Sequence, residues 1–109
     1  MPVGAFTSLG HRLSGIVLAA SAAPAIGVLA RSLRDEPGYA EATSLLGHPA
    51  FKAALAIVVW ALAHHVLAGI RHLLSDFDVG SPLRSARRSA WLVNVGAVVL
   101  ALFAVAFLR

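Results

Sequence analysis

The stretch AALAIVVWALAHHVLAGI, residues 53–70, contains no charged residue and decides the fold class. A helix over these residues is about 27 Å long, close to the roughly 30 Å thickness of the hydrocarbon core of a membrane. Lys52 and Arg71 flank the stretch, and their long side chains reach water from the ends of such a helix. Because a backbone in lipid must satisfy its own hydrogen bonds, we expect a membrane-spanning helix here.

Two more uncharged windows, residues 13–30 and 89–108, are long enough to cross a membrane in the same way. The sequence therefore predicts an all-α membrane protein with three transmembrane helices, at about residues 8–31, 50–75 and 88–108. We interpret residues 1–109 as a single transmembrane anchor domain.

The first window has a competing interpretation as a cleaved secretory signal, because residues 20–22 read Ala-Ser-Ala. However, the apolar run continues to Ala30, and Ser14 and Gly15 interrupt the part that would be the hydrophobic region of the signal. We therefore favour a retained span, in which Pro24 is tolerated.

The composition supports a membrane protein. Hydrophobic residues make up 59% of the chain and charged residues 13%, whereas soluble domains average about 45–50% and about 25%. The net charge is +4, but the basic residues mark the ends of the uncharged windows instead of gathering on one face, so we expect the lipid bilayer and no nucleic acid as a partner. The absence of cysteine excludes disulfides, thiolate-held iron–sulfur clusters and thioether-linked haem within this chain.

The connection between the first two windows predicts a short surface helix. Residues 35–37, Asp-Glu-Pro, are an acidic helix start with proline in the first turn, and Gly47 is placed to close the helix. Pro49 then suits the first turn of the second span.

The distribution of charge predicts an orientation. The amino-terminal side holds the basic residues Arg12, Arg71, Arg84, Arg87 and Arg88 with the acids Asp76 and Asp78. The other side holds Arg31, Arg34, Lys52 and Arg109 with the acids Asp35, Glu36 and Glu41. Because basic segments stay on the cytoplasmic side, we expect a multi-pass protein with a cytoplasmic amino terminus.

Histidines in the second span are the main candidate site. His65, Gly69 and His72 follow a spacing that places them on one helix face. His65 lies about 13 Å of helix rise from the end of the span, and a neutral imidazole next to a glycine suits an axial ligand of haem iron. Hydrogen bonding between helices, with Gly69 as a close-packing point, explains the same residues equally well. His64 points about 100° away, and we interpret it as an interhelical hydrogen-bonding residue.

The start of the first span carries a second candidate site. One face of this helix carries two polar residues at its start and two small residues beyond them, namely Ser8, Arg12, Gly15 and Ala19. The hydroxyl of Ser8 and the guanidinium of Arg12 suit a ligand with carbonyl or carboxylate oxygens. A capping Ser8 and an Arg12 that merely reaches water are the alternative. We expect His11 at the depth of His72.

Several other polar residues have more ordinary explanations. Asp76 follows His72 by one helical turn, where it is either a solvated helix end or an assistant in proton supply. Asn94 is expected to hydrogen-bond between helices, and the basic run Arg84, Arg87 and Arg88 to set topology or meet anionic headgroups.

Two strings together resemble a known family. Residues 8–15 read SLGHRLSG and residues 64–76 read HHVLAGIRHLLSD, which match the signatures S-x-x-H-R-x-[ST]-G and H-x-x-x-G-x-R-H-x-x-x-D. In order, spacing and location on the first two of three spans, they resemble the cytochrome b subunits of succinate dehydrogenase, the larger membrane anchors of respiratory complex II.

The resemblance implies cofactors and site residues. It implies that His65 is the axial ligand of a haem b, with the second ligand supplied by a smaller anchor subunit. It implies that Ser8 and Arg12 contact ubiquinone or another quinone, and that His11 and Arg12 approach the haem propionates. His72 and Asp76 lie where they could supply protons near the quinone or the haem edge.

The resemblance also implies an assembly. The chain would form half of a heteromeric helical bundle in a bacterial inner membrane, with a second small anchor, an iron–sulfur subunit and a flavoprotein subunit as partners. It would be non-catalytic alone and would pass electrons from the iron–sulfur subunit to quinone. The alternatives are the anchor of a fumarate reductase, which runs in reverse, and a cofactor-free three-helix scaffold.

Overall fold

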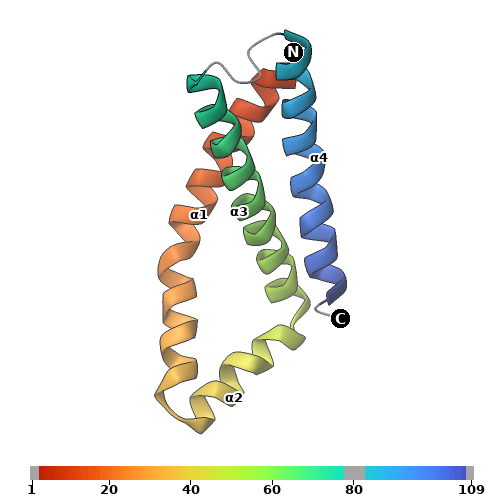
Figure 1. Cartoon of the computed structure of the whole chain (residues 1–109). Coiled ribbons are helices and arrows are strands. Elements are labelled where there is room, and N and C mark those ends of the chain that lie inside the picture. The colour runs from red at the N-terminus through yellow and green to blue at the C-terminus, as the bar shows by residue number, and fades with distance from the viewer. Residues whose placement is uncertain (1–2, 78–82, 108–109) are drawn as a thin grey trace.

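The computed structural model describes residues 3–77 and 83–107, and this part of the chain is helical throughout apart from short turns (Figure 1). Its elements are α1 (Val3–Arg34), α2 (Glu36–Ser44), the short 3-10 helix η1 (Leu45–Gly47), α3 (Pro49–Asp76) and α4 (Leu83–Phe107). By length and composition α1, α3 and α4 can each cross a membrane. The all-α prediction with three spans is confirmed for the described residues.

The helices extend further than the apolar windows predicted. α1 begins at Val3 instead of residue 8, and α4 begins at Leu83 instead of residue 88. Hydropathy marks the part of a helix that suits lipid, but a helix continues until its backbone changes direction. α1 therefore runs past Pro24 to Arg34 and stops where Asp35 takes extended dihedral angles, φ −163° and ψ 175°.

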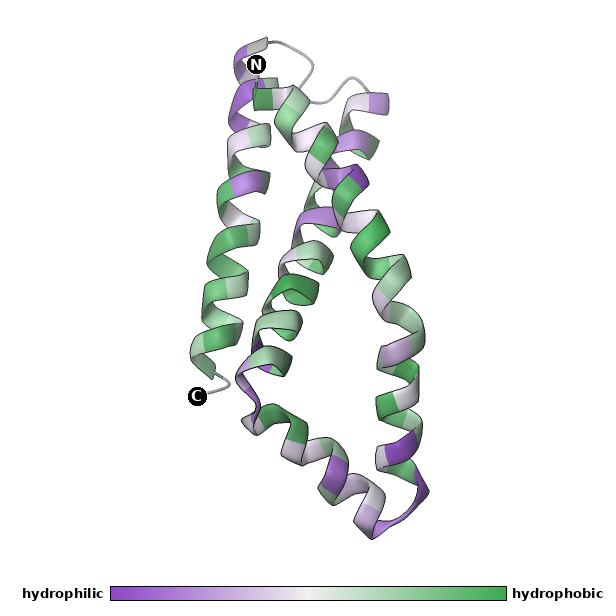
Figure 2. Ribbon diagram, turned by 180° about the vertical axis from the view of Figure 1, so that it is seen from behind, coloured by the Kyte–Doolittle hydropathy of each residue, from purple (hydrophilic) through white to green (hydrophobic). Residues whose placement is uncertain are grey.

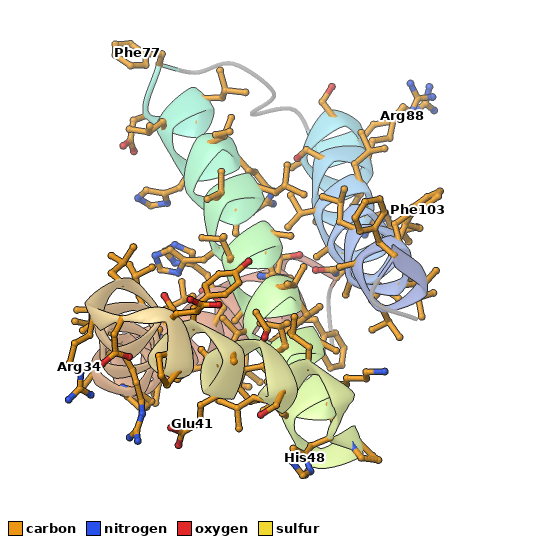
Figure 3. All side chains as sticks on the ribbon, turned by 90° about the horizontal axis from the view of Figure 1, so that it is seen from below. Arg34, Glu41, His48, Phe77, Arg88 and Phe103 are labelled. Atoms are coloured by element: carbon orange, nitrogen blue, oxygen red, sulfur yellow. The ribbon has the colours of Figure 1, made fainter. Side chains whose placement is uncertain are left out.

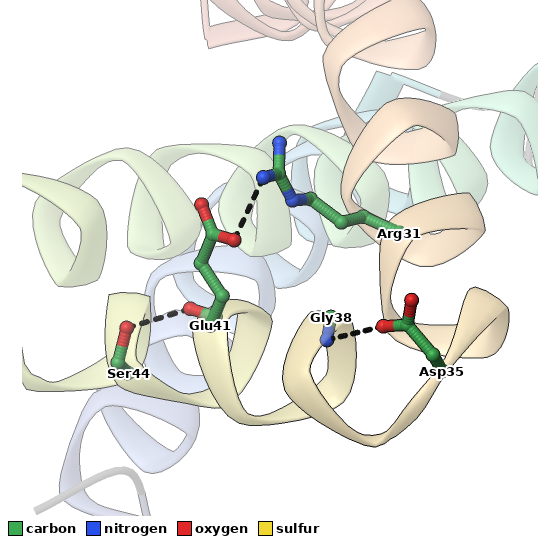
Figure 4. Close-up of polar contacts among 5 residues, drawn as sticks. All are labelled: Arg31, Asp35, Gly38, Glu41 and Ser44. Atoms are coloured by element: carbon green, nitrogen blue, oxygen red, sulfur yellow. Dashed lines mark hydrogen bonds and ion pairs between the residues drawn. The ribbon is translucent and has the colours of Figure 1, made fainter.

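The predicted surface helix is confirmed as α2, and its first turn is tied to the end of α1 (Figure 4). The backbone N–H of Gly38 donates a 2.7 Å hydrogen bond to the side chain of Asp35, which is the N-cap. Arg31 forms a 2.8 Å ion pair with Glu41 across the same corner. The helix gives way to η1 after Ser44, so Gly47 ends η1 and not α2 itself.

Small residues bring the long helices together. The buried apolar side chains of the described residues are Ala61, Ala68, Ala90, Val93 and Ala97, all on α3 and α4. Close backbone approach of this kind is typical of helices packed in membranes, where large side chains are left to face lipid. Accordingly, Ile26 and Leu33 on α1 and Phe103 on α4 are exposed by 66%, 76% and 70%.

The molecule is an elongated bundle of 55 × 24 × 20 Å that opens toward one end. The start of α1, the end of α3 and the start of α4 lie together at one end, and α2 bridges α1 and α3 at the other (Figure 1). Figure 2 shows hydrophobic residues along the lengths of the three spans and hydrophilic residues concentrated toward the two ends. The described chain thus has the polar–apolar–polar layering that a bilayer requires.

Candidate functional site

Two histidines from different helices stack against each other. The rings of His11 on α1 and His65 on α3 have centroids 4.3 Å apart and an interplanar angle of 13°. A Cβ added to Gly15 would lie 3.3 Å from Cε1 of His65, and one added to Gly69 would lie 3.9 Å from Nε2 of His11. Each helix therefore presents a glycine to the imidazole of the other, which lets the backbones approach at the site.

Hydrogen bonds fix the orientation of the His65 ring. Its Nδ1 lies 3.3 Å from the carbonyl oxygen of His11 and 3.3 Å from Oγ of Ser14, and the Ser14 hydroxyl donates to the same carbonyl at 2.9 Å. Because a carbonyl only accepts, the bond to His11 places the imidazole proton on Nδ1. This leaves a lone pair on Nε2, to which no described residue hydrogen-bonds.

Ser14 is a member of this site that the sequence did not single out as functional. The resemblance covered it only as the small polar position of the first motif. Its position three residues after His11 places both on one side of α1, which was the available signal. Its side chain is fully buried at 0% exposure.

Ser8 and Arg12 lie apart from the histidine pair. Both are exposed, whereas Gly15, predicted on the same helix face, lies against His65. Within the described residues neither side chain forms a hydrogen bond or ion pair with another element. The structure thus presents a hydroxyl and a guanidinium one turn apart on the outer surface of α1.

His72 and Asp76 form an exposed pair at the end of α3. Nε2 of His72 lies 4.0 Å from Oδ1 of Asp76, and the side chains are 76% and 59% exposed. His11 stacks on the ring of His65, and its Nε2 would lie 3.9 Å from a Cβ added to Gly69, three residues before His72. The common depth of His11 and His72 stays a prediction.

A second polar cluster lies on the other side of α3. His64 is 3% exposed and its Nε2 donates a 3.1 Å hydrogen bond to Oδ1 of Asn94, which also lies 3.2 Å from Oγ1 of the buried Thr7. The interhelical hydrogen bonds predicted for His64 and Asn94 are therefore confirmed. Nδ1 of His64 is buried without a partner among the described residues, and a Cβ added to Gly10 would lie 2.5 Å from Cε1 of this ring.

Arg71 joins the last part of α3 to the first part of α4. Its Nε donates to the hydroxyl of Ser89 at 3.0 Å, and its Nη2 donates to the carbonyl of Ala86 at 3.3 Å. These bonds hold the end of α3 against the start of α4. The described residues contain no group of three or more His, Cys, Asp or Glu side chains arranged to hold a metal ion.

The fold and the site define an α-helical membrane protein whose first two spans hold a stacked histidine pair between them. Comparison with known proteins narrows this class. The chain belongs to the succinate dehydrogenase/fumarate reductase transmembrane subunit family, whose family model matches residues 1–105. The resemblance expected from the two motifs is thereby confirmed.

Two curated relatives agree with this assignment. The chain is 31% identical to the succinate dehydrogenase cytochrome b556 subunit of Paracoccus denitrificans, over 93% of this chain and 78% of the relative. It is 34% identical to the succinate dehydrogenase cytochrome b556 subunit of Coxiella burnetii, over 86% of this chain and 76% of the relative.

Proposed function

We propose that this chain is the haem b- and quinone-binding membrane anchor of a succinate dehydrogenase, through which electrons pass from an iron–sulfur subunit to ubiquinone. The observation that carries the proposal is the setting of His65: its Nδ1 lies 3.3 Å from the carbonyl oxygen of His11, and no described residue hydrogen-bonds to its Nε2. Ligand histidines are characteristically anchored through their second nitrogen in this way. The relatives from Paracoccus and Coxiella bear the name cytochrome b556.

The residues around His65 fit a haem b. A neutral imidazole is a preferred axial ligand, and the glycines at positions 15 and 69 let α1 and α3 approach each other closely around the His65 ring. His11 and Arg12 lie next to each other on α1, where they would meet the propionates. When bound, the haem supplies a carrier for one electron at a time.

One ligand from this chain requires a second from elsewhere. We assign it to another small anchor subunit, so that this chain forms half of a heteromeric bundle as a single transmembrane anchor domain. The large exposed apolar side chains of α1 provide surface for such an association. An iron–sulfur subunit and a flavoprotein subunit would sit on the cytoplasmic side of a bacterial inner membrane.

The quinone site is proposed at the exposed polar pair of α1. The Ser8 hydroxyl and the Arg12 guanidinium donate hydrogen bonds to a quinone carbonyl, whose oxygen becomes more negative as the ring is reduced. A pair at the membrane edge can receive protons from water, and His72 with Asp76 offers a titratable pair at the matching end of α3.

The haem assignment is tested by His65→Ala in the purified complex. We expect loss of the low-spin haem spectrum, because the substitution removes the nitrogen that would ligate the iron. His48→Ala is the control, since His48 is exposed and its side chain makes no capping bond. An unchanged reduced-minus-oxidised spectrum in His65→Ala would exclude His65 as the ligand, and a complex without any Soret band would favour the cofactor-free scaffold.

The quinone assignment is tested by Ser8→Ala and Arg12→Gln. Each should lower quinone-linked turnover by about tenfold or more, as expected for losing a donor to a developing charge, while succinate oxidation with a soluble artificial acceptor stays unchanged. Arg34→Gln, at the other end of α1, is the control. Wild-type quinone turnover and inhibitor sensitivity in both variants would place the pocket elsewhere. Comparing the rates of succinate oxidation and fumarate reduction in the same complex distinguishes the anchor of a succinate dehydrogenase from that of a fumarate reductase.

A further inference from the structure

The outer face of α4 carries a groove that the proposed function does not use. It has a volume of approximately 1000 Å³ and runs from Arg84, Arg87 and Arg88 past Trp91 to Val95 and Val99. Arg88 and Phe103, seen along the bundle in Figure 3, point away from α1 and α3. The groove therefore lies on the opposite side of the bundle from the contact between His11 and His65.

The groove has the polarity of a lipid molecule. Arg84, Arg88, Trp91, Val95 and Val99 recur at spacings of three and four residues, so they form one stripe on the helix. The rise from Arg88 to Val99 is about 16 Å, roughly half the thickness of the hydrocarbon core. The basic residues thus lie at the membrane surface, and the aliphatic residues extend across one leaflet. Trp91, which is 60% exposed, lies between them, at the depth where tryptophans are enriched in membrane proteins.

The charge at the mouth of the groove selects an anionic occupant. α4 contains no acidic residue, and no carboxylate within the described residues lies at ion-pair distance from the three arginines. Guanidinium groups bind phosphate oxygens in pairs, and they repel the cationic part of a zwitterionic headgroup. A covering protein helix would instead have to supply carboxylates for three closely spaced arginines or leave them buried and unpaired.

We propose that the groove of α4 is a binding site for one anionic phospholipid. Its phosphate lies among Arg84, Arg87 and Arg88, and one acyl chain follows Trp91, Val95 and Val99. A smaller apolar groove begins at Val99 and continues along Leu102, Phe103 and Ala106. The apolar surface of α4 therefore extends past the end of the acyl chain toward the other leaflet.

Trp91 provides a reporter inside the site. The chain has 2 tryptophans, so Trp60→Phe leaves Trp91 alone, and phenylalanine keeps an aromatic ring next to His64. The full chain with this substitution is reconstituted in phosphatidylcholine vesicles that contain a fixed minor fraction of a lipid brominated on its acyl chains. The brominated lipid is either phosphatidylglycerol or phosphatidylcholine, and quenching of Trp91 fluorescence measures its occupancy of the groove.

We expect brominated phosphatidylglycerol at Trp91 to exceed its bulk fraction by about fivefold or more, and brominated phosphatidylcholine to match its bulk fraction. Changing Arg84, Arg87 and Arg88 together to glutamine should remove the excess, whereas Arg34→Gln with Lys52→Gln should keep it. Added salt should reduce the excess in the unchanged groove, which tests the charge without any arginine variant. Equal quenching by both lipids would overturn the proposal, and so would weak quenching by both, because protein would then cover the groove.

Discussion

At the scale of single residues, two glycines of α1 allow the histidines of α3 to pack closely against it. Gly10 faces His64 and Gly15 faces His65, so two neighbouring histidines on different sides of α3 each meet a glycine of the same helix. In a membrane, where lipid competes for apolar contacts, such close backbone approach supplies much of the attraction between helices.

Gly10→Ala should destabilise the bundle. The added Cβ would lie 2.5 Å from Cε1 of His64, and that ring cannot swing aside without breaking its 3.1 Å bond to Asn94. Because overpacking of this kind costs about 1–3 kcal/mol, we expect the free energy of unfolding to fall by that amount. It is measured by titrating the reconstituted chain with a denaturing detergent and following the helix content by circular dichroism. Gly27→Ala is the matched control, because no atom lies within 4 Å of its added Cβ. Equal effects of the two substitutions would show that the approach at Gly10 is not needed.

The sequence predicted part of this site, but it could not predict how the helices pack against each other. Helical spacing correctly gave which residues of α3 share a face, and it separated His64 from His65. It could not give the rotation and crossing of α1 relative to α3, which depend on packing. The stacking of His11 on His65 and the meeting of Thr7, His64 and Asn94 therefore appear only in the folded chain.

At the scale of elements, the corner between α1 and α2 is built by local bonds. Asp35 caps α2, Arg31 pairs with Glu41, and Gly38 is buried against α1 (Figure 4). The ion pair is exposed and therefore contributes little, so the cap and the close approach of Gly38 determine the turn.

Gly38→Ala should loosen α2 from α1. The added Cβ would press against the backbone carbonyl of Arg31 and lie 2.8 Å from Oδ1 of Asp35, so relief requires movement of the backbone and loss of the cap. We expect amide hydrogens of α2 to exchange about tenfold faster, measured by mass spectrometry of the chain in detergent. Gly47→Ala, where no atom lies within 4 Å of the added Cβ, should leave exchange unchanged. Unaltered protection in Gly38→Ala would mean that the corner tolerates the shift.

Sequence patterns predicted the elements better than their ends. The three spans and the surface helix followed from hydropathy, charge and the Asp-Glu-Pro start, because these properties act locally. The ends of α1 and α4 did not, since polar residues can continue a helix beyond the hydrocarbon. Cap geometry at Asp35, rather than hydropathy, marks where α1 stops.

At the scale of the whole molecule, the two ends of the bundle differ in charge. The end that contains the start of α1 and the start of α4 carries Arg12, Arg71 and the arginines of the α4 groove, whereas the end with α2 carries a nearly balanced set. Positive charge is retained in the cytoplasm during insertion. The first end should therefore face the cytoplasm, where a soluble iron–sulfur subunit would dock.

This orientation can be measured directly, because the chain has no cysteine of its own. Ser44 and Ser75 form a matched pair: both are exposed, and each hydroxyl donates to the carbonyl three residues earlier, at 2.6 Å and 2.9 Å. Ser44 lies at the end of α2 and Ser75 near the end of α3, on opposite sides of the predicted membrane. In intact cells a membrane-impermeant thiol reagent should label Ser44→Cys and spare Ser75→Cys until the membrane is permeabilised. Labelling of Ser75→Cys in intact cells would reverse the orientation and place the start of α1, with Ser8 and Arg12, on the outer face.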